Sequence, residues 1–266
     1  MSETGKPDPE PKSGSAILFL HGRFGMGWHW QKVIDRLADR YHCFAPDLPG
    51  FGSSVLEESR ALSVFEHAQL ARNLVTRLTE SFEDVFVVGH DIGGSIALIC
   101  ATFAAPRISG LVLINCAGLG APASAFRTGW FGFSSRRLFS RAASASRHLS
   151  PVDRRELMAP WRAGSSRSAI IRAFRAIESS WPGPLGQESW ERKVSALQIP
   201  VLVLKGSRDP VNRREVDREL LRQLPGALYF EEESCGHWPA LERPEWVAPK
   251  LREFFFNSRK SYGHMQ

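Results

Sequence analysis

The sequence predicts an α/β protein with a mostly parallel central sheet, helices on both faces of that sheet, and an inserted helical lid. Two observations carry this prediction. Short, continuous apolar runs alternate with longer helical stretches up to residue 117 and return after residue 198. Between them, no apolar strand is apparent. With 266 residues, 43% of them hydrophobic, the chain is long enough to bury one large core and carry an insertion.

The first part of the core is expected to hold four strands, each followed by a turn or a helix. Strands are predicted over 16–20, 41–45, 85–90 and 111–115, because these runs are apolar and short. A helix is predicted from residue 30 to 40, and a second begins at a capping box formed by Ser63 and Glu66 and ends near residue 80. A third follows the strand at 85–90 and ends at residue 105, before Pro106.

The middle of the chain is predicted to form the lid, over residues 118–197. Helices are expected at 151–162, with Ser150 as N-cap and Pro151 at the first helical position, and at 165–178. Two strands at 200–204 and 227–231 and a closing helix at 244–255 complete the core. The core thus covers 15–117 and 198–257, with a disordered tail at 1–14 and a C-terminal tail at 258–266.

Charge and cysteine usage narrow the classes of partner. The net charge is +6, and eleven arginines but only two acids fall between Arg127 and Arg175. These arginines either attract an anionic substrate or form a solvated helical face, and the second interpretation is favoured. No nucleic-acid motif accompanies them. Four dispersed cysteines, no signal-peptide pattern and no apolar run long enough to cross a membrane predict a cytoplasmic protein.

One stretch, from Val85 to Ser95, has the pattern of a nucleophile elbow. A β-branched run ends at Gly89-His90-Asp91-Ile92-Gly93, which keeps the spacing Gly-x-Ser-x-Gly but places Asp91 where a serine is usual. The corner residue of such a turn is strained, so the positions two residues away on either side need to be nearly free of side chain. A carboxylate at this corner changes the bond that the protein can attack.

Two further polar residues follow predicted strands: Asp209 in Gly206-Ser207-Arg208-Asp209-Pro210, and His237 in Cys235-Gly236-His237-Trp238-Pro239. Reactive groups of parallel sheets lie at the carboxyl ends of strands. The order nucleophile, acid, histidine resembles the α/β-hydrolases over residues 15–256. An aspartate at the elbow is similar to the epoxide hydrolases and haloalkane dehalogenases. By match to the superfamily's His-Gly motif at His21-Gly22, the resemblance also implies an oxyanion hole formed by the N–H groups of Arg23 and Ile92.

These residues imply a covalent mechanism. A carboxylate is already ionised at neutral pH, so Asp91 can displace a leaving group at a saturated carbon and form an alkyl ester. His237 then activates water against the ester, and Asp209 orients His237. The alternative is that Asp91 only caps the following helix. Asp47, in a Pro-Gly loop, is interpreted as structural. No metal and no cofactor are expected, because no Cys/His cluster has ligand spacing.

The leaving group is the open question. Opening of an epoxide is the first expectation and cleavage of a carbon–halogen bond the second. A non-hydrolytic cyclase or lyase and a ligand-binding protein without turnover are the alternatives from other classes. The lid has no tyrosine to protonate an epoxide oxygen, so His148, an arginine or a tryptophan N–H has to serve as donor.

The substrate is expected to be a small molecule, bulky and aromatic, because the chain contains eight tryptophans. About half of them are expected to line the pocket and the others to anchor the core. The predicted substrate-binding residues are His148 and six aromatic residues, namely Phe24, Trp130, Trp161, Trp181, Trp190 and Trp238. Only a short polar tail precedes the first strand, so the sheet edge is expected to be exposed or covered in a homodimer.

Overall fold

The computed structural model describes residues 14–23, 25–54, 56–57, 60–104, 107–118, 142–162, 164–180, 187–212 and 214–262. Six strands form one sheet in the order β2-β1-β3-β4-β5-β6, and all of the pairings are parallel. The strands are β1 (Ser15–Leu20), β2 (His42–Phe44), β3 (Asp84–His90), β4 (Gly110–Ile114), β5 (Val201–Gly206) and β6 (Leu228–Glu232). The parallel α/β architecture predicted from the sequence is therefore confirmed.

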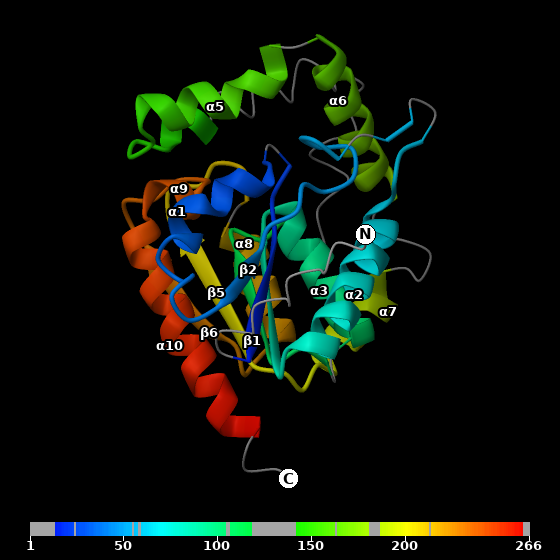
Figure 1. Ribbon diagram of the computed structural model, residues 1–266, viewed down its shortest axis with the longest axis vertical. Helices are drawn as coiled ribbons and strands as arrows, with labels where there is room; N and C mark the ends of the chain where they lie inside the picture. The colour runs from blue at the N-terminus through cyan, green and yellow to red at the C-terminus, as the bar shows by residue number, and fades with distance from the viewer. Residues whose placement is uncertain are drawn as a thin grey trace, which may run out of the picture.

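Helices cover both faces of the sheet. The short η1 (Gly27–Trp30) and α1 (Gln31–Ile34), with α9 (Pro239–Glu242) and α10 (Pro244–Tyr262), lie on one side, whereas α2 (Val64–Ser81), α3 (Ile92–Ala104) and α7 (Gln187–Ser195) lie on the other (Figure 1). The helix α8 (Arg214–Gln223) connects β5 to β6. Between β4 and β5 in the chain, α5 (Pro151–Arg162) and α6 (Gly164–Ser179) lie across the upper end of the sheet in Figure 1.

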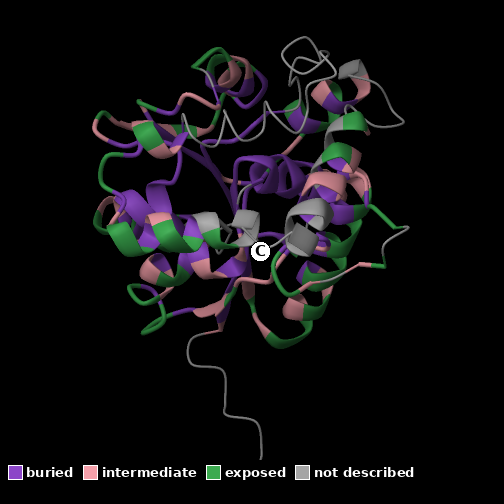
Figure 2. Ribbon diagram, turned by 90° about the horizontal axis from the view of Figure 1, so that it is seen from above, coloured by how far each residue is buried: buried purple, intermediate pink, exposed green. Residues whose placement is uncertain are grey.

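The strands feed two hydrophobic cores because their side chains alternate between the faces. On β1, Ile17 and Phe19 pack with α1 and α10, while Leu18 and Leu20 pack with α2 and α3. All four side chains are buried, as expected for a parallel sheet covered on both faces. Figure 2 shows the buried residues gathered in the middle of the molecule, with the exposed residues around them.

The predicted helix starts are confirmed. Ser63 and Glu66 form the capping box of α2: the Glu66 N–H donates to the Ser63 hydroxyl (3.1 Å), and the Ser63 N–H donates to the Glu66 carboxylate (2.8 Å). At the start of α5, the Asp153 N–H donates to the Ser150 hydroxyl (3.1 Å). Asp153 also accepts from Lys32 at 2.6 Å, which fastens α5 to α1.

Three α-helices were not predicted, and the closing helix was predicted too short. The helix predicted from residue 30 to 40 was too long, because α1 ends at Ile34 and the residues after it form turns. In α8 only Asp217, Leu220 and Gln223 are buried, so few apolar residues mark its buried face. The helices α7 and α9 are short. The closing helix continues to Tyr262 instead of ending at 255 before a tail, because Ser258 is buried and Arg259 donates to Asp84 on β3 at 2.6 Å.

The cysteines agree with the sequence. All four cysteines carry free thiols, and Cys100, Cys116 and Cys235 are buried. The strand β2 lies at one edge of the sheet, and within the described residues no strand precedes β1. None of the helices in the described part of the chain combines the length and the apolar character needed to cross a membrane.

Candidate active site

The turn between β3 and α3 has the strained geometry of an elbow. Asp91 adopts a left-handed backbone conformation with φ of 54°. A Cβ atom on Gly89 would lie 2.4 Å from the Gly93 carbonyl oxygen, and one on Gly93 would lie 2.4 Å from that of His21. Both positions therefore require glycine, for the reason predicted from the sequence. The Asp91 side chain is held at the corner between the strand and the helix.

The Asp91 carboxylate binds two other loops and does not cap α3. Its Oδ2 atom accepts from the backbone N–H of Arg23 (2.9 Å) and from Arg23 Nε (2.8 Å). Its Oδ1 atom accepts from Asn212 Nδ2 at 2.9 Å. The backbone carbonyl of Asp91, and not its side chain, accepts from the N–H groups of Gly94 and Ser95. The helix-cap interpretation of this carboxylate is therefore wrong.

The arrangement differs in one respect from the expected oxyanion hole. The Arg23 N–H lies at the carboxylate as expected, but the second donor to Oδ2 is the Arg23 guanidinium. In the hydrogen bonds among the described residues, Ile92 does not donate to this oxygen. Asp91 is fully buried and Arg23 is 5% exposed, so this ion pair is shielded from solvent.

The surroundings keep Asp91 ionised. Burial alone would raise its pKa, but the charge of Arg23, followed by that of His237, outweighs burial and holds the pKa well below its usual range. Asp91 is consequently a carboxylate over the whole working range of a protein. It can serve as a nucleophile, and it has no proton to offer as an acid.

His237 and Asp209 form a buried pair. His237 Nδ1 lies 3.0 Å from Asp209 Oδ1, and both side chains are inaccessible to solvent. Burial opposes ionisation of Asp209, yet His237 and its hydrogen bond lower the pKa of this carboxyl. The His237 N–H donates to the Ser146 hydroxyl (3.1 Å) and its carbonyl accepts from His90 Nε2 (2.6 Å). The loops after β5 and β6 thus bring the predicted acid and histidine together.

The histidine next to the elbow is neutral. Burial, followed by the charge of His237, lowers the pKa of His90 to about 4. Because a carbonyl can only accept, the contact with His237 requires the proton of His90 to lie on Nε2. His90 therefore fixes the backbone of the His237 loop and adds no charge near Asp91 at neutral pH. This role could not be predicted from the position of His90 next to Asp91 in the sequence.

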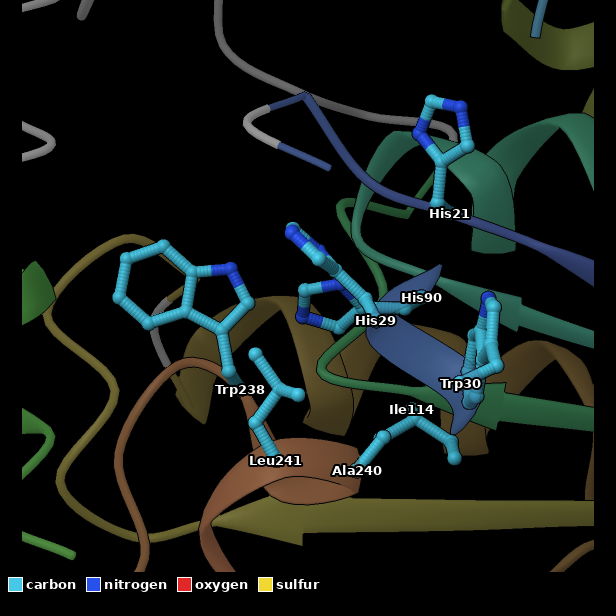
Figure 3. A pocket seen from close by; sticks show the side chains of 8 residues that line it. All are labelled: His21, His29, Trp30, His90, Ile114, Trp238, Ala240 and Leu241. Carbon is cyan, nitrogen blue, oxygen red and sulfur yellow. The ribbon is translucent and has the colours of Figure 1, made fainter. Parts of the chain in front are cut away.

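A small cavity lies beside these residues. It is lined by His21, His29, Trp30, His90, Ile114, Trp238, Ala240 and Leu241, and has a volume of about 10 Å³, which is room for about one water molecule. Figure 3 shows its side chains, with Trp238 on one side and Trp30 on the other. Asp91 is not among the lining residues.

The predicted substrate-binding residues are dispersed. Trp238 is 2% exposed, lines the cavity and contacts the His237 ring edge-on at 5.0 Å. The prediction that Trp190 binds substrate is wrong. Trp190 lies in the core, where its ring contacts those of Phe65 and Phe103, and it is 1% exposed. His148 is exposed. Phe24, Trp130 and Trp181 lie outside the described residues, and for Trp161, on α5, only the backbone is described.

Two asparagines at the site were missed. Asn212 touches Asp91, and Asn115, directly after β4, accepts from Asn212 Nδ2 through its carbonyl (2.6 Å). Asn115 has φ of 42°, a left-handed conformation that asparagine adopts more readily than most residues. An asparagine directly after an apolar strand was therefore the signal available in the sequence. The prediction for Asp47 is confirmed, because its carboxylate accepts from Gly27 and Ser53 and joins two loops. The described residues contain no group of three or more side chains arranged to hold a metal ion.

Comparison with known proteins decides the family. Residues 17–250 match the model of the alpha/beta hydrolase family. The chain belongs to that family.

Two curated relatives of this family member match over most of their length. A cis-3-alkyl-4-alkyloxetan-2-one decarboxylase of Xanthomonas campestris pv. campestris is 25% identical over 93% of this chain and 90% of that protein. Haloalkane dehalogenase 2 of Mycobacterium tuberculosis is 24% identical, over 91% of this chain and 88% of that protein.

A solved structure agrees in fold. The structure of a 2-hydroxy-6-oxo-6-phenylhexa-2,4-dienoate hydrolase from a Rhodococcus species superposes with a TM-score of 0.72 at 24% identity, over 92% of this chain and 91% of that chain. At this identity the likeness extends to the fold alone. The alpha/beta hydrolase architecture predicted from the three motifs is thereby shown by sequence and by structure.

Proposed function

We propose that this α/β-hydrolase breaks a polarised bond at a saturated carbon of its substrate through a covalent ester on Asp91. One observation supports it above the others. Asp91 is buried, ionised and held on the strained elbow by donors from Arg23 and Asn212. A buried carboxylate kept anionic at this corner is suited to nucleophilic attack without a base.

The hydrogen bonds distinguish the two oxygens of this nucleophile. Oδ2 accepts two donors from Arg23, whereas Oδ1 accepts one from Asn212. Donors withdraw electron density, so Oδ1 is the better nucleophile. In the first step Oδ1 bonds to the substrate carbon, and the leaving group departs with the electron pair of its broken bond. Oδ2 becomes the carbonyl oxygen of the ester, with the Arg23 N–H in place to stabilise it.

Charge conservation then indicates which leaving group suits the site. Once Asp91 is esterified it is neutral and no longer balances the positive charge of the Arg23 guanidinium, which is 5% exposed. An anion that departs beside Arg23 restores this balance by taking the place of the carboxylate. A guanidinium does not give up its proton. The site therefore favours a leaving group that remains an anion, such as a halide or a carboxylate.

This reverses the order expected from the sequence. An epoxide yields an alkoxide that needs a proton, which Arg23 does not supply, so epoxide opening becomes the second candidate. The names of the two relatives contain a haloalkane and an oxetan-2-one. An oxetan-2-one is a strained cyclic ester, and its opening at the alkyl carbon releases a carboxylate. An aromatic substrate remains part of the proposal, supported by Trp238 against His237.

The second step regenerates the enzyme. His237, oriented by Asp209, takes a proton from water, and the resulting hydroxide attacks the ester carbonyl of Asp91. The tetrahedral intermediate collapses with cleavage of the bond between Cγ and the alkylated Oδ1, so the product leaves as an alcohol that carries this oxygen. The proton held by His237 goes to that alcohol. One oxygen of the restored carboxyl group comes from water, and the second proton of that water is released to solvent as the group ionises.

The alternatives make different demands on Asp91. A lyase that uses this residue as an acid needs it protonated, which its lowered pKa opposes. A binding protein without turnover needs only the ion pair with Arg23. These alternatives are separated from the proposal by whether a covalent bond to Asp91 ever forms.

The test is to trap the ester. In His237→Gln the first step proceeds and the second is blocked, so an aryl-alkyl bromide should add the mass of its alkyl group to the protein, with fragmentation locating it on Asp91. His42→Gln, which changes a histidine on the edge strand β2, should turn over without an adduct. Parallel reactions with an aryl-substituted oxetan-2-one and an aryl epoxide rank the leaving groups. No adduct from any of the three, with unchanged turnover in Asp91→Ala, would reject the mechanism.

A further inference from the structure

The Asn212 side chain links the proposed nucleophile to the end of a neighbouring strand. Its Nδ2 atom donates one hydrogen to Asp91 Oδ1 (2.9 Å) and the other to the backbone carbonyl of Asn115 (2.6 Å). Asn212 is 5% exposed, and both of its partners are fully buried. Because both amide hydrogens are used, the NH₂ group has one orientation in which it satisfies Asp91 and Asn115 together.

Asn115 ties this contact to the rest of the site. Its side-chain oxygen accepts from the Gly206 N–H at the end of β5 (2.8 Å). Its Nδ2 donates to the carbonyls of Gly236 (2.9 Å) and His237 (3.1 Å). The left-handed backbone of Asn115 turns its carbonyl toward Asn212 while its side chain holds these two loops. One residue therefore contacts both Asn212 and the His237 backbone.

A buried ammonium holds the backbone of Asn212 from the other side. Lys205, on β5, is 1% exposed; its Nζ donates to the Asn212 carbonyl and lies 3.1 Å from Asp217 Oδ2 on α8. Burying such a pair gains little stability, because desolvation offsets the attraction between the charges. The pair does fix the direction of the loop from β5 to α8, which carries both Asp209 and Asn212.

We propose that Asn212 is a positioning residue that sets the rotation of the Asp91 carboxylate, so that Oδ1 is the oxygen that attacks, and that Lys205 and Asp217 hold Asn212 in place. The inference rests on the ester mechanism proposed above. Both of these hydrogen bonds from Arg23 go to the other oxygen, Oδ2. Without a second contact at Oδ1, the carboxylate plane can turn about its bond to Cβ, and a misaligned nucleophile loses much of its rate.

The test isolates the first step. In the His237→Gln background, the rate of adduct formation with the aryl-alkyl bromide is measured by intact mass. At pH 8, Asn212→Leu and Asn212→Asp should each slow it about 100-fold. The double substitution Lys205→Met with Asp217→Leu, which removes both buried charges, should slow it about 10-fold. Asn73→Asp, the same charge change at an exposed position on α2, should leave the rate unchanged.

The pH profile separates positioning from a general structural defect. In Asn212→Asp, the introduced carboxyl faces Asp91, and two adjacent carboxylates share a proton at raised pH. Protonated, the new group donates to Oδ1 as the amide did, so the rate should recover toward that of the parent between pH 8 and 6. Asn212→Leu should stay slow throughout. In this background, the other charged or titratable groups around this position include Arg23, His90, Asp209, Lys205, Asp217 and Cys116, and they are present in the parent measured alongside.

The outcomes are distinct. If the parent forms the adduct and the Asn212 variants form it at the same rate as the parent, the positioning role is overturned and the ester mechanism stays intact. No adduct in the parent overturns both. If Asn212→Leu does not fold, the recovery of Asn212→Asp at lower pH and the effect of the Lys205–Asp217 double variant decide the question. A flat pH profile in Asn212→Asp contradicts the inference.

Discussion

Arg23 donates twice to the same oxygen of Asp91: its backbone N–H lies 2.9 Å, and its Nε 2.8 Å, from Oδ2. Arg23, in the loop after β1, thereby supplies both a backbone donor to this carboxylate and its counter-charge. The ion pair explains why a fully buried carboxyl remains ionised. It also connects the choice of leaving group to a single side chain.

Replacing Arg23 tests this connection. Arg23→Met keeps the backbone donor and removes the guanidinium, so the first step should slow by about 100-fold or more, as for the loss of one oxyanion donor. The pKa of Asp91 should rise, and an acidic limb should appear in the pH profile of adduct formation in the His237→Gln background. Arg208→Met, which changes an exposed arginine in the Asp209 loop, is the control. An unaltered rate and profile in Arg23→Met would show that the guanidinium is not required.

The acid of the proposed triad should affect only the second step. Asp209→Asn removes the carboxylate that lies 3.0 Å from His237 Nδ1, so the imidazole loses the partner that orients it and stabilises its charged form. Hydrolysis of the ester should slow by about 1,000-fold or more, whereas formation of the ester should change little. Pre-steady-state kinetics with mass detection separate the two rates. Asp35→Asn, at an exposed position, should behave as wild type; an equal loss in both steps of Asp209→Asn contradicts this role.

The elbow glycines offer a stability test. In Gly89→Ala the new methyl group would lie 2.4 Å from the Gly93 carbonyl oxygen and 2.6 Å from Gly94 Cα. Both are backbone atoms of the elbow, so the free energy of unfolding should fall by about 3 kcal/mol or more. Gly226→Ala meets nothing within 4 Å and should change it by less than about 1 kcal/mol. Urea unfolding measures both. A loss below about 1 kcal/mol in Gly89→Ala would mean that the elbow relaxes freely.

The elbow glycines are one of the features that could be predicted from the sequence. Glycine spacing, apolar runs and strand-end polar residues are local signals, and they located the sheet, the elbow, Asp209 and His237. The partner of an ion pair between the loops of two neighbouring strands has no such local signal. Arg23 was expected to contribute only its backbone N–H, because a single sequence does not reveal that its side chain folds back onto Asp91 68 residues away.

The missed elements have the same origin. Asn212 reaches Asp91 across 121 residues of sequence, and nothing in Pro210-Val211-Asn212 marks it as polar core. The number of tryptophans likewise could not show which of them line a pocket and which lie in the core. Trp190 lies in the core, where its ring contacts those of Phe65 and Phe103. The helix α8 was not predicted because its buried face consists of two polar residues and one leucine.

The buried histidines predict how stability depends on pH. Burial lowers the pKa of His21 and of His90 to about 4, and that of His29 well below 6.5. These groups stay neutral in the folded protein but take up protons in the unfolded chain below about pH 6.5. Their contribution to stability is therefore complete above that pH and is lost as the pH falls. Each adds a slope of about 1.4 kcal/mol per pH unit.

His29→Phe isolates one of these protons. The ring nitrogens of His29 have no hydrogen-bond partner among the described residues, so the substitution breaks no described hydrogen bond. Between pH 6 and 5, the free energy of unfolding from urea titrations should fall less steeply in His29→Phe, by about one proton's slope. Asp217, whose pKa burial raises to about 6, contributes a slope of opposite sign in both proteins and cancels. Parallel lines for the two proteins would mean that His29 protonates without opposing the fold.

The most direct measurement of the central claim is a single turnover in ¹⁸O-labelled water with enzyme in excess over the aryl-alkyl bromide. In an ester mechanism the first product alcohol carries an oxygen from Asp91, and the label from water enters the Asp91 carboxylate. We expect a mass increase of the peptide that contains Asp91 and an unlabelled alcohol. A labelled alcohol, with Asp91 unchanged, would show that water attacks the substrate directly and that no ester forms.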